Sequence, residues 1–218
     1  TVPQNYFNNA LYPVKVDPTF GYTSLGASNG ASIATNFGTI VSGSVGRTGD
    51  NTYPLAEAGN VTSMSMGLVV SGGSSPQVLD LFFALYREDS AAADSHDLVA
   101  SAESLNVSVS STAAFYTINF ASESLTADTY ILAALGNGAD LTGTNPNVAH
   151  RLDTGGSNLR LYNETSSGAG GYATRKAENP WTEVDAASTN LSSFYATYTA
   201  SGGGVIPPKP NLLLMGVG

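Results

Sequence analysis

The sequence predicts an all-β protein, in which one antiparallel β-sandwich carries an extended arm at each end. Short segments of alternating apolar and polar residues recur along the chain, and turn residues separate them at intervals of roughly 8–12 residues. No window of about ten residues keeps a helical period. We therefore expect an N-terminal arm over residues 1–32, a sandwich domain over 33–200, and a Gly/Pro linker with an apolar tail over 201–218.

Composition limits the classes of function. The chain has 218 residues, of which 42% are hydrophobic and only 11% are charged, so it has enough apolar residues for a core and relies on Ser, Thr, Asn and Gly for solubility. Its formal charge is −9 and it has no basic cluster, which argues against nucleic acid as a partner. No apolar stretch has the length of a membrane span, and the absence of cysteine excludes thiol chemistry.

Two segments give the clearest strand predictions. Residues 61–70 place Met64, Met66, Leu68 and Val70 on one face by alternation. Residues 78–86 are apolar on both faces, which is typical of a central strand. Further strands are expected at 98–109, with alternation through Leu105, Val107 and Val109; at 114–120 and 129–135, joined by a turn at 122–128; at 147–152 and 159–162, paired around Gly155 and Gly156; and at 194–199, with Phe194, Ala196 and Tyr198 on one face.

The two ends are predicted to hold neighbouring molecules. The N-terminal segment interleaves prolines with aromatic residues, which forbids a helix and disfavours a central strand. It either lays its aromatics on another subunit or straps its own sandwich. At the other end, glycines and prolines precede an apolar peptide that is costly to expose to water. The predicted docking residues are Tyr6, Phe7, Tyr12, Phe20, Leu212, Leu213, Leu214 and Met215.

Three segments occur in an order that resembles a widespread jelly-roll module of phage virion proteins and bacterial surface proteins. They are FALYRED at 83–89, LTADTYILA at 125–133 and FYATY at 194–198. That module is similar in fold to carbohydrate-binding modules, and Asp128 stands where it usually has glycine. The resemblance spans residues 61–199 and implies a jelly-roll sandwich on the surface of a virion.

The sequence contains no catalytic motif. It lacks a nucleophile elbow, a paired-histidine metal motif and a phosphate-binding glycine loop. His96 and His150 are expected to be surface polar residues, and Glu88 and Glu183 have nothing that marks them as a catalytic pair. We therefore expect a protein that is not an enzyme and needs no cofactor.

Two groups of residues suggest a binding site, and each also has a purely structural explanation. Asp89, Asp94 and Asp97 suit a structural calcium ion, although a solvated acidic loop explains them as well. Trp181, with Tyr162 and Tyr172 in neighbouring segments, could stack on a glycan, but a lone tryptophan more often plugs one end of a core.

Three functions then compete. The first is a virion structural protein, either a capsid decoration subunit or a tail or fibre subunit. It would bind other virion proteins and itself, with a trimer favoured, because exchanged arms build an oligomer at low cost. The second is a carbohydrate-binding module or cell-surface adhesin that binds host glycans, and the third is a hydrolase. The first accounts for both arms and for the missing catalytic groups.

Overall fold

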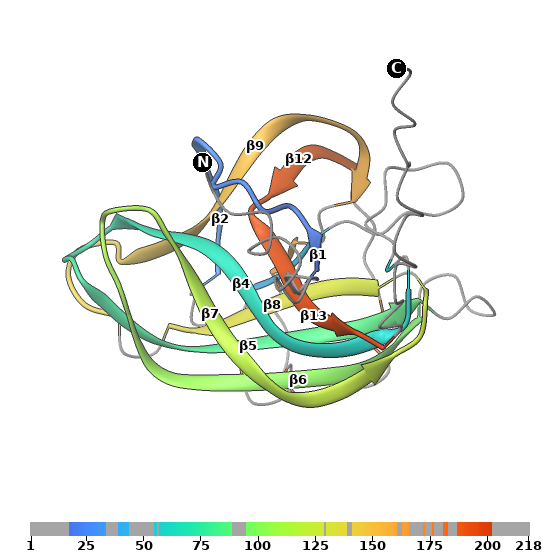
Figure 1. Cartoon of the computed structure of the whole chain (residues 1–218). Helices are drawn as coiled ribbons and strands as arrows, with labels where there is room; N and C mark the ends of the chain where they lie inside the picture. Colours follow the sequence, from blue (N-terminus) through green and yellow to red (C-terminus); the bar gives the residue numbers. More distant parts are fainter. Residues whose placement is uncertain are drawn as a thin grey trace, which may run out of the picture.

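The computed structural model describes residues 18–33, 39–43, 55, 57–88, 95–128, 130–138, 141–160, 163–165, 172, 176, 181–182 and 187–201. Within these ranges the elements are β-strands, and all the paired strands are antiparallel (Figure 1). One sheet, called sheet A, contains β1 (Thr19–Gly21), β2 (Ser28–Ser32), β4 (Gly59–Gly72), β7 (Ala114–Leu125), β9 (Asn147–Arg160), β12 (Ala187–Ser192) and β13 (Phe194–Ala200).

The second sheet, called sheet B, has the strand order β10-β3-β8-β5-β6-β11. Its strands are β3 (Thr39–Gly43), β5 (Gln77–Glu88), β6 (Ser95–Val109), β8 (Tyr130–Asn137), β10 (Asn163–Thr165) and β11 (Trp181–Thr182). The predicted all-β antiparallel sandwich is confirmed. The jelly-roll order of the strands stays a prediction.

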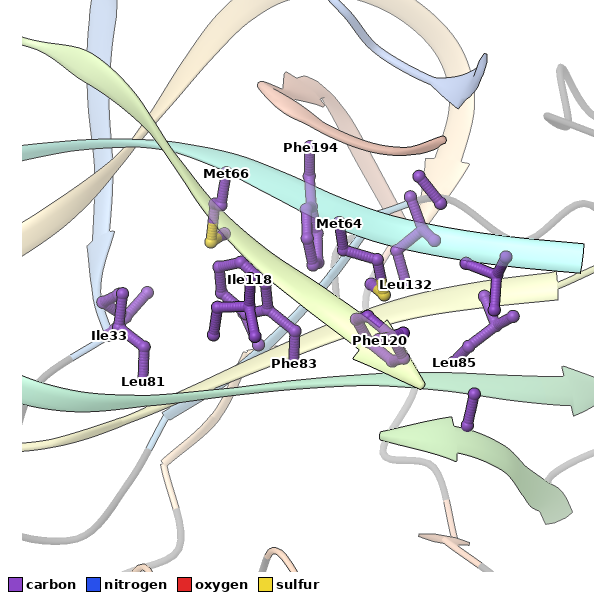
Figure 2. Packing of buried hydrophobic residues seen from close by; sticks show 14 of the residues in the cluster. Ile33, Met64, Met66, Leu81, Phe83, Leu85, Ile118, Phe120, Leu132 and Phe194 are labelled. Carbon is purple, nitrogen blue, oxygen red and sulfur yellow. The ribbon is translucent and has the colours of Figure 1, made fainter. Parts of the chain in front are cut away.

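The main hydrophobic core lies between the two sheets (Figure 2). The predicted apolar face of β4 is confirmed, since Met64, Met66, Leu68 and Val70 are all buried in this core. Opposite them, the alternate residues Leu79, Leu81, Phe83 and Leu85 of β5 are buried. The predicted face of β13 is confirmed as well, and the ring centroid of its Phe194 lies 5.2 Å from that of Phe83.

Sheet B is apolar on its outer face too. Strand β5 lies between β6 and β8, as its two apolar faces predict. On the side away from the main core, its Phe82, Ala84 and Tyr86 form a second buried cluster with Ile131, Ala133 and Leu135 of β8. Leu98 and Tyr172 pack against this cluster. The outer face of sheet B is therefore a covered surface.

The alternation predicted for β6 is wrong at Leu105. Its side chain is 62% exposed, whereas Val109 is buried and Val107 packs against the core. The cause is a β-bulge: Leu105 and Asn106 together lie opposite the single residue Asp80. Asn106 has a positive φ of 55°, and its amide donates to the Asp80 carboxylate at 3.0 Å. The extra residue turns Leu105 toward solvent.

The predicted short pair around Gly155 and Gly156 is also wrong. Both glycines lie inside one long strand, β9, whose second half pairs with β12 instead of folding back on itself. Four residues of β9, 155–158, lie opposite the single residue Thr189 of β12. The glycines therefore occupy a bulged stretch of strand, which is the other common place for glycine in a sheet.

The chain from β12 to β13 lies between β4 and β9, where these two strands separate. Strands β4 and β9 pair at Leu68–Gly72, and beyond that point β13 pairs with β4 while β12 pairs with β9. At the fork, the Gly67 amide donates to the Ser193 carbonyl at 2.7 Å, and the Ser193 amide donates to the Arg151 carbonyl at 2.9 Å. Ser193 thus joins the two halves of sheet A.

The connection from β7 to β8 leads from one sheet to the other. Strand β7 continues to Leu125, so the turn is shorter than the predicted 122–128 and covers residues 126–128. The Tyr130 hydroxyl accepts from the Thr126 amide at 3.1 Å and donates to the Thr126 carbonyl at 3.0 Å. Buried Leu125 and Tyr130 hold the two ends of this crossover in the core.

Residues 18–33 belong to the sandwich, although the sequence assigned residues up to 32 to an arm. Strand β1 pairs with the outer edge of β13, and β2 pairs with β9. Phe20 is only 5% exposed and its ring contacts those of Tyr130 and Tyr198 in the core. Residues 18–33 therefore pack on their own sandwich, which is the second of the two alternatives predicted for the N-terminal segment.

Candidate functional site

Most of the predicted docking residues lie outside the described part of the chain. These are Tyr6, Phe7, Tyr12, Leu212, Leu213, Leu214 and Met215. The exception is Phe20, which is a core residue of its own sandwich and is not available at a surface. Docking by the ends of the chain therefore stays a prediction, and Phe20 no longer contributes to it.

The structure does not test the calcium prediction. Asp97 is an exposed residue of β6 opposite Arg87, while Asp89 and Asp94 lie outside the described residues. Within the described ranges, no three His, Cys, Asp or Glu residues are grouped so that they could hold a metal ion.

The structure describes only part of the glycan site predicted from the sequence, so this site stays a prediction. The hydroxyl of Tyr172 contacts Glu103 on β6, whereas the backbone of Trp181 pairs with His96 near the start of the same strand. Glu103 and His96 pair with Phe82 and Glu88 of β5, so they are about 20 Å apart along the sheet. Tyr162 and the side chain of Trp181 lie outside what the structure describes.

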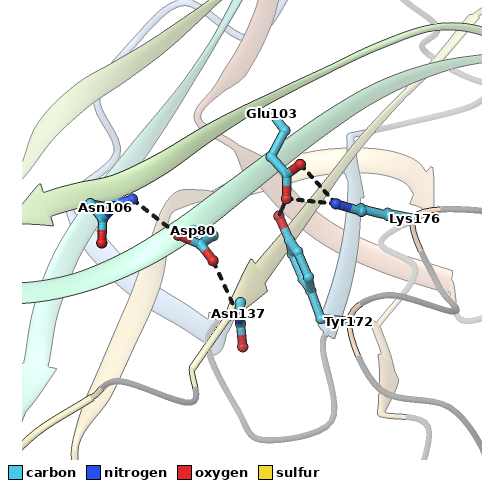
Figure 3. A network of polar contacts seen from close by, with 6 residues as sticks. All are labelled: Asp80, Glu103, Asn106, Asn137, Tyr172 and Lys176. Carbon is cyan, nitrogen blue, oxygen red and sulfur yellow. Dashed lines mark hydrogen bonds and ion pairs between the residues drawn. The ribbon is translucent and has the colours of Figure 1, made fainter.

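A polar cluster joins the chain between β10 and β11 to sheet B (Figure 3). Glu103 accepts a hydrogen bond from the Tyr172 hydroxyl at 2.7 Å and forms an ion pair with Lys176, at 2.7 Å and 2.8 Å from its two oxygens. The Lys176 ammonium lies 5.2 Å from the centroid of the Tyr172 ring. We call these three residues the Glu103 cluster.

The electrostatics of the Glu103 cluster favour a structural role. The hydrogen bond from Lys176 holds the pKa of Glu103 below its usual value, and burial raises the pKa of the Tyr172 phenol. A general acid requires the opposite, a carboxyl with a raised pKa. The two described residues between β10 and β11 lie on the apolar outer face, and those strands are at opposite borders of sheet B. The cluster therefore fastens Tyr172 and Lys176 to sheet B beside the second hydrophobic cluster.

A second carboxylate on sheet B, Asp80, is used to hold the bulge in β6. One of its oxygens accepts from the Asn106 amide, and the other accepts from the Asn137 side chain at 3.2 Å (Figure 3). The bonds of Asp80 and of Glu103 both join neighbouring segments of the chain. Both carboxylates therefore act as cross-links within the body of the protein.

Replacing Glu103 with glutamine should lower the free energy of unfolding by about 1 kcal/mol at neutral pH, because the ion pair is partly exposed. The difference between wild type and Glu103→Gln should depend on pH. The pKa of Glu103 is lowered in the folded state, so its contribution is present above its usual value of 4.5 and is lost as pH falls through the folded value. Urea denaturation of both proteins between neutral and strongly acidic pH measures this. A constant difference at all pH values would contradict the ion pair.

The expectation that both histidines lie at the surface is wrong for His150. Its side chain is completely buried, beneath Gly30 of β2. A Cβ atom at position 30 would lie 2.2 Å from the imidazole ring, so the ring occupies the space that glycine leaves. A histidine enclosed in this way cannot meet a substrate. Of His96, the structure gives the backbone pairing with Glu88 and Trp181.

The loop between β1 and β2 is clamped to the end of sheet A. Asp153 of β9 accepts from the Tyr22 hydroxyl at 2.7 Å and from the Ala27 amide at 2.8 Å. The Tyr22 hydrogen bond lowers the pKa of Asp153, and the same bond raises the pKa of Tyr22. Arg151 donates to the Gly26 carbonyl at 2.9 Å and to the Asn29 side chain. These bonds give the outer face of sheet A a fixed rim.

Both ends of the described chain lie at one corner of sheet A. The Tyr198 amide donates to the Pro18 carbonyl at 3.0 Å, where β1 begins. Just beyond the end of β13, the Ser201 amide donates to the Ala58 carbonyl at 2.8 Å. The segments that precede Pro18 and follow Ser201 are therefore attached next to each other.

Sequence reasoning missed an aromatic pair on the outer face of sheet A. Phe115 of β7 and Tyr195 of β13 have ring centroids 5.2 Å apart. The signal was present in the alternation: if Phe194 and Ala196 face the core, Tyr195 faces outward. Phe115 lies on the same face of β7, two residues along the strand from Thr117, which is the residue level with Tyr195.

No protein-family model, curated protein sequence or solved structure matches this chain significantly. The fold and the contacts therefore define the class of protein, which is an all-β sandwich of two antiparallel sheets. Among the described residues, no helix is long and apolar enough to cross a membrane.

Proposed function

We propose that this protein is a non-enzymatic structural subunit of a virion surface, either a capsid decoration protein or a tail or fibre component. In this role the sandwich is the exposed body, and the two ends of the chain bind neighbouring subunits. The partners are other virion proteins and further copies of this chain, with a trimer favoured. The resemblance of residues 61–199 to the virion jelly-roll module is the origin of this proposal.

The observation that carries the proposal is the common corner at which both ends are attached. Pro18 and Ser201 are both fixed by backbone hydrogen bonds beside the end of β13. Two segments that begin at one corner can bind a neighbour together, and the second contact then forms at a high effective concentration. Two ends attached at distant places would need separate partners or separate surfaces.

The chemistry of the C-terminal segment agrees with this role. The sequence of residues 201–210 combines three consecutive glycines with a Pro-Pro-Lys-Pro stretch, a composition that predicts a hinge followed by a stiff spacer. The spacer carries Leu212, Leu213, Leu214 and Met215, an apolar run that gains free energy when a partner covers it. In the body, Asp80, Glu103 and Asp153 are each engaged in cross-links, which supports a scaffold rather than a catalyst.

Replacing Leu212, Leu213 and Leu214 with serine should remove the chain from the particle that contains it. The apolar tail would lose most of the surface that a neighbour covers, while the body would keep its stability. The measurement is the amount of this chain in purified particles assembled with the variant, compared with particles that carry the wild-type chain. We expect at least a tenfold loss, which corresponds to about 1.4 kcal/mol of binding free energy.

The matched control is Leu105→Ser, which removes an exposed leucine from the body without touching the tail. This variant should enter the particle at the wild-type level. Normal incorporation of the tail variant would overturn docking by the C-terminal segment. Equal loss of both variants would show a general effect of lost apolar surface and would also count against it.

A further inference from the structure

The outer face of sheet A carries two aromatic rings in edge-to-face contact, those of Phe115 and Tyr195, which we call the aromatic step. Phe115 of β7 and Tyr195 of β13 lie on the strands that flank β4, and their rings meet above it at an interplanar angle of 72°. They can meet because the β4 residues between them, Ser65 and Gly67, are small. Ser65 is only 2% exposed as a result, although it is on the outer face. Both residues are partly exposed, so the step presents some of its surface to solvent.

Polar side chains without charge continue this face next to the step. Cross-strand pairing places Tyr195, Ser65 and Thr117 in one row, and the Ser65 and Thr117 hydroxyls are 2.7 Å apart. The next row on the same face contains Thr197, Ser63 and Asn119, about 7 Å further along the strands. Both rows are at least partly open to solvent at Thr117, Asn119 and Thr197. Hydroxyl and amide groups therefore lie in the same row as the Tyr195 ring and in the next row along the strands.

The clamped loop between β1 and β2 closes one end of the face. Leu25 is 40% exposed and lies directly over Gly67, whose Cβ position would be 2.7 Å from the leucine Cδ1 atom. Gly67 is also the residue paired with Phe115. Leu25 thereby extends the apolar step up to the rim that Asp153 and Arg151 hold in place. Because this rim is cross-linked, the face is formed before any ligand arrives.

The chemistry of the face selects the ligand. Its apolar part is aromatic and angular, and its polar part offers both donors and acceptors. None of the outward positions of the two rows has a charged side chain, and Asp153 and Arg151 at the rim are engaged with the loop. A pyranose has the matching character, because its C–H face is apolar and its rim consists of neutral hydroxyl groups. An acidic ligand would find no cation among these rows.

We propose that the outer face of sheet A binds a neutral carbohydrate, with a sugar ring stacked on the Phe115–Tyr195 step and its hydroxyls bonded to the Thr117 and Asn119 rows. This inference does not rest on the proposed virion role, since it concerns the body of the protein and not its ends. It also differs from the glycan site predicted from the sequence, which involved Trp181, Tyr162 and Tyr172.

The test is binding of the full-length protein to a panel of neutral oligosaccharides: cello-, malto-, laminari-, manno- and xylo-oligomers, with oligogalacturonate as the charged comparison. Saturation-transfer NMR and calorimetry at ligand concentrations up to about 1 mM detect the weak affinities expected of an open face. We expect at least one neutral member to bind and oligogalacturonate to fail. Tyr195→Ala should weaken the affinity at least tenfold, whereas Tyr195→Phe, which keeps the ring, should bind within about threefold of wild type.

Two further variants keep the result interpretable. Asn119→Arg leaves both rings in place and adds a long charged side chain to an exposed position of the same face, so it should also abolish binding even if Tyr195→Ala does not fold. Tyr172→Ala, on the outer face of sheet B, should leave the affinity unchanged. Thermal unfolding of each variant checks that the sandwich is intact.

Three outcomes would overturn the proposal. The first is that no neutral oligosaccharide binds, and the second is that binding survives both Tyr195→Ala and Asn119→Arg. The third is that a synthetic peptide with the sequence of residues 211–218 occupies the face and no sugar displaces it. That last result would support tail docking while removing the carbohydrate site, so the two proposals can fail separately.

Discussion

Replacing Phe83 with alanine is expected to lower the free energy of unfolding by about 3–5 kcal/mol, the largest effect of any single truncation we propose. Phe83 is fully buried at the centre of β5, and its ring contacts that of Phe194 from the opposite sheet. Its removal leaves a cavity between the two sheets. The hydrogen bonds between strands keep each sheet in place, so a small shift cannot close this cavity. A loss of this size is a large part of the 5–15 kcal/mol that typically stabilises a domain.

Chemical denaturation, followed by circular dichroism, measures this change. Leu105→Ala is the matched control, because that side chain is 62% exposed beside the bulge and should alter the free energy of unfolding by less than about 0.5 kcal/mol. If both variants lost the same small amount, the packing of the two sheets around Phe83 would be contradicted.

Gly26→Ala is expected to detach the loop between β1 and β2 from sheet A. A Cβ atom at this position would lie 2.2 Å from the carbonyl carbon of Leu152, and a backbone atom in a sheet cannot move aside. The Gly26 amide donates to the Ser193 hydroxyl at 2.8 Å, and the Gly26 carbonyl accepts from Arg151. Both bonds would be lost or strained, so we expect the free energy of unfolding to fall by about 2–4 kcal/mol.

Hydrogen exchange locates this effect. The Ala27 amide, which donates to Asp153 in the wild type, should exchange much faster in Gly26→Ala, while amides in the middle of β5 should change only with global stability. Ser28→Ala, an exposed position in the same segment, serves as the control and should leave both quantities unchanged. Unaltered protection of Ala27 in the glycine variant would contradict the close approach of the loop to β9.

The core strands could be predicted from the sequence because their signal is local. In β4 and β13 an apolar residue at every second position shows directly which side faces the main core. The central place of β5 follows from the apolar residues on both of its faces. The LTADTY segment at the β7–β8 crossover also has a local reason, since the Tyr130 hydroxyl bonds back to Thr126.

The features that were missed depend on residues far apart in the chain. The bulge at Asn106 needs the carboxylate of Asp80, and the burial of His150 needs the missing side chain of Gly30. The glycine pair at 155–156 is an ordinary turn signal, yet the long-range ladder with β12 keeps it within a strand. Phe20 was assigned to an arm because the edge of β13 that receives β1 is not visible in the sequence.

The contacts at the two candidate surfaces also differ in whether the sequence predicts them. The contact of Tyr172 with Glu103 joins residues that no spacing rule connects. The Phe115–Tyr195 step, by contrast, follows from alternation once the partner strands are known. Sequence therefore predicts which residues face outward, and only the register of the sheet shows which of them meet.

The most direct test of the proposed role is an electron cryo-microscopy reconstruction of the native particle that contains this chain. We expect the corner formed by Pro18 and Ser201 to face a neighbouring subunit, with residues 1–17 and 211–218 seated on that neighbour and the rest of the sandwich exposed. A reconstruction in which both ends fold back on their own sandwich, with neighbours held only through the outer faces of the sheets, would contradict the account.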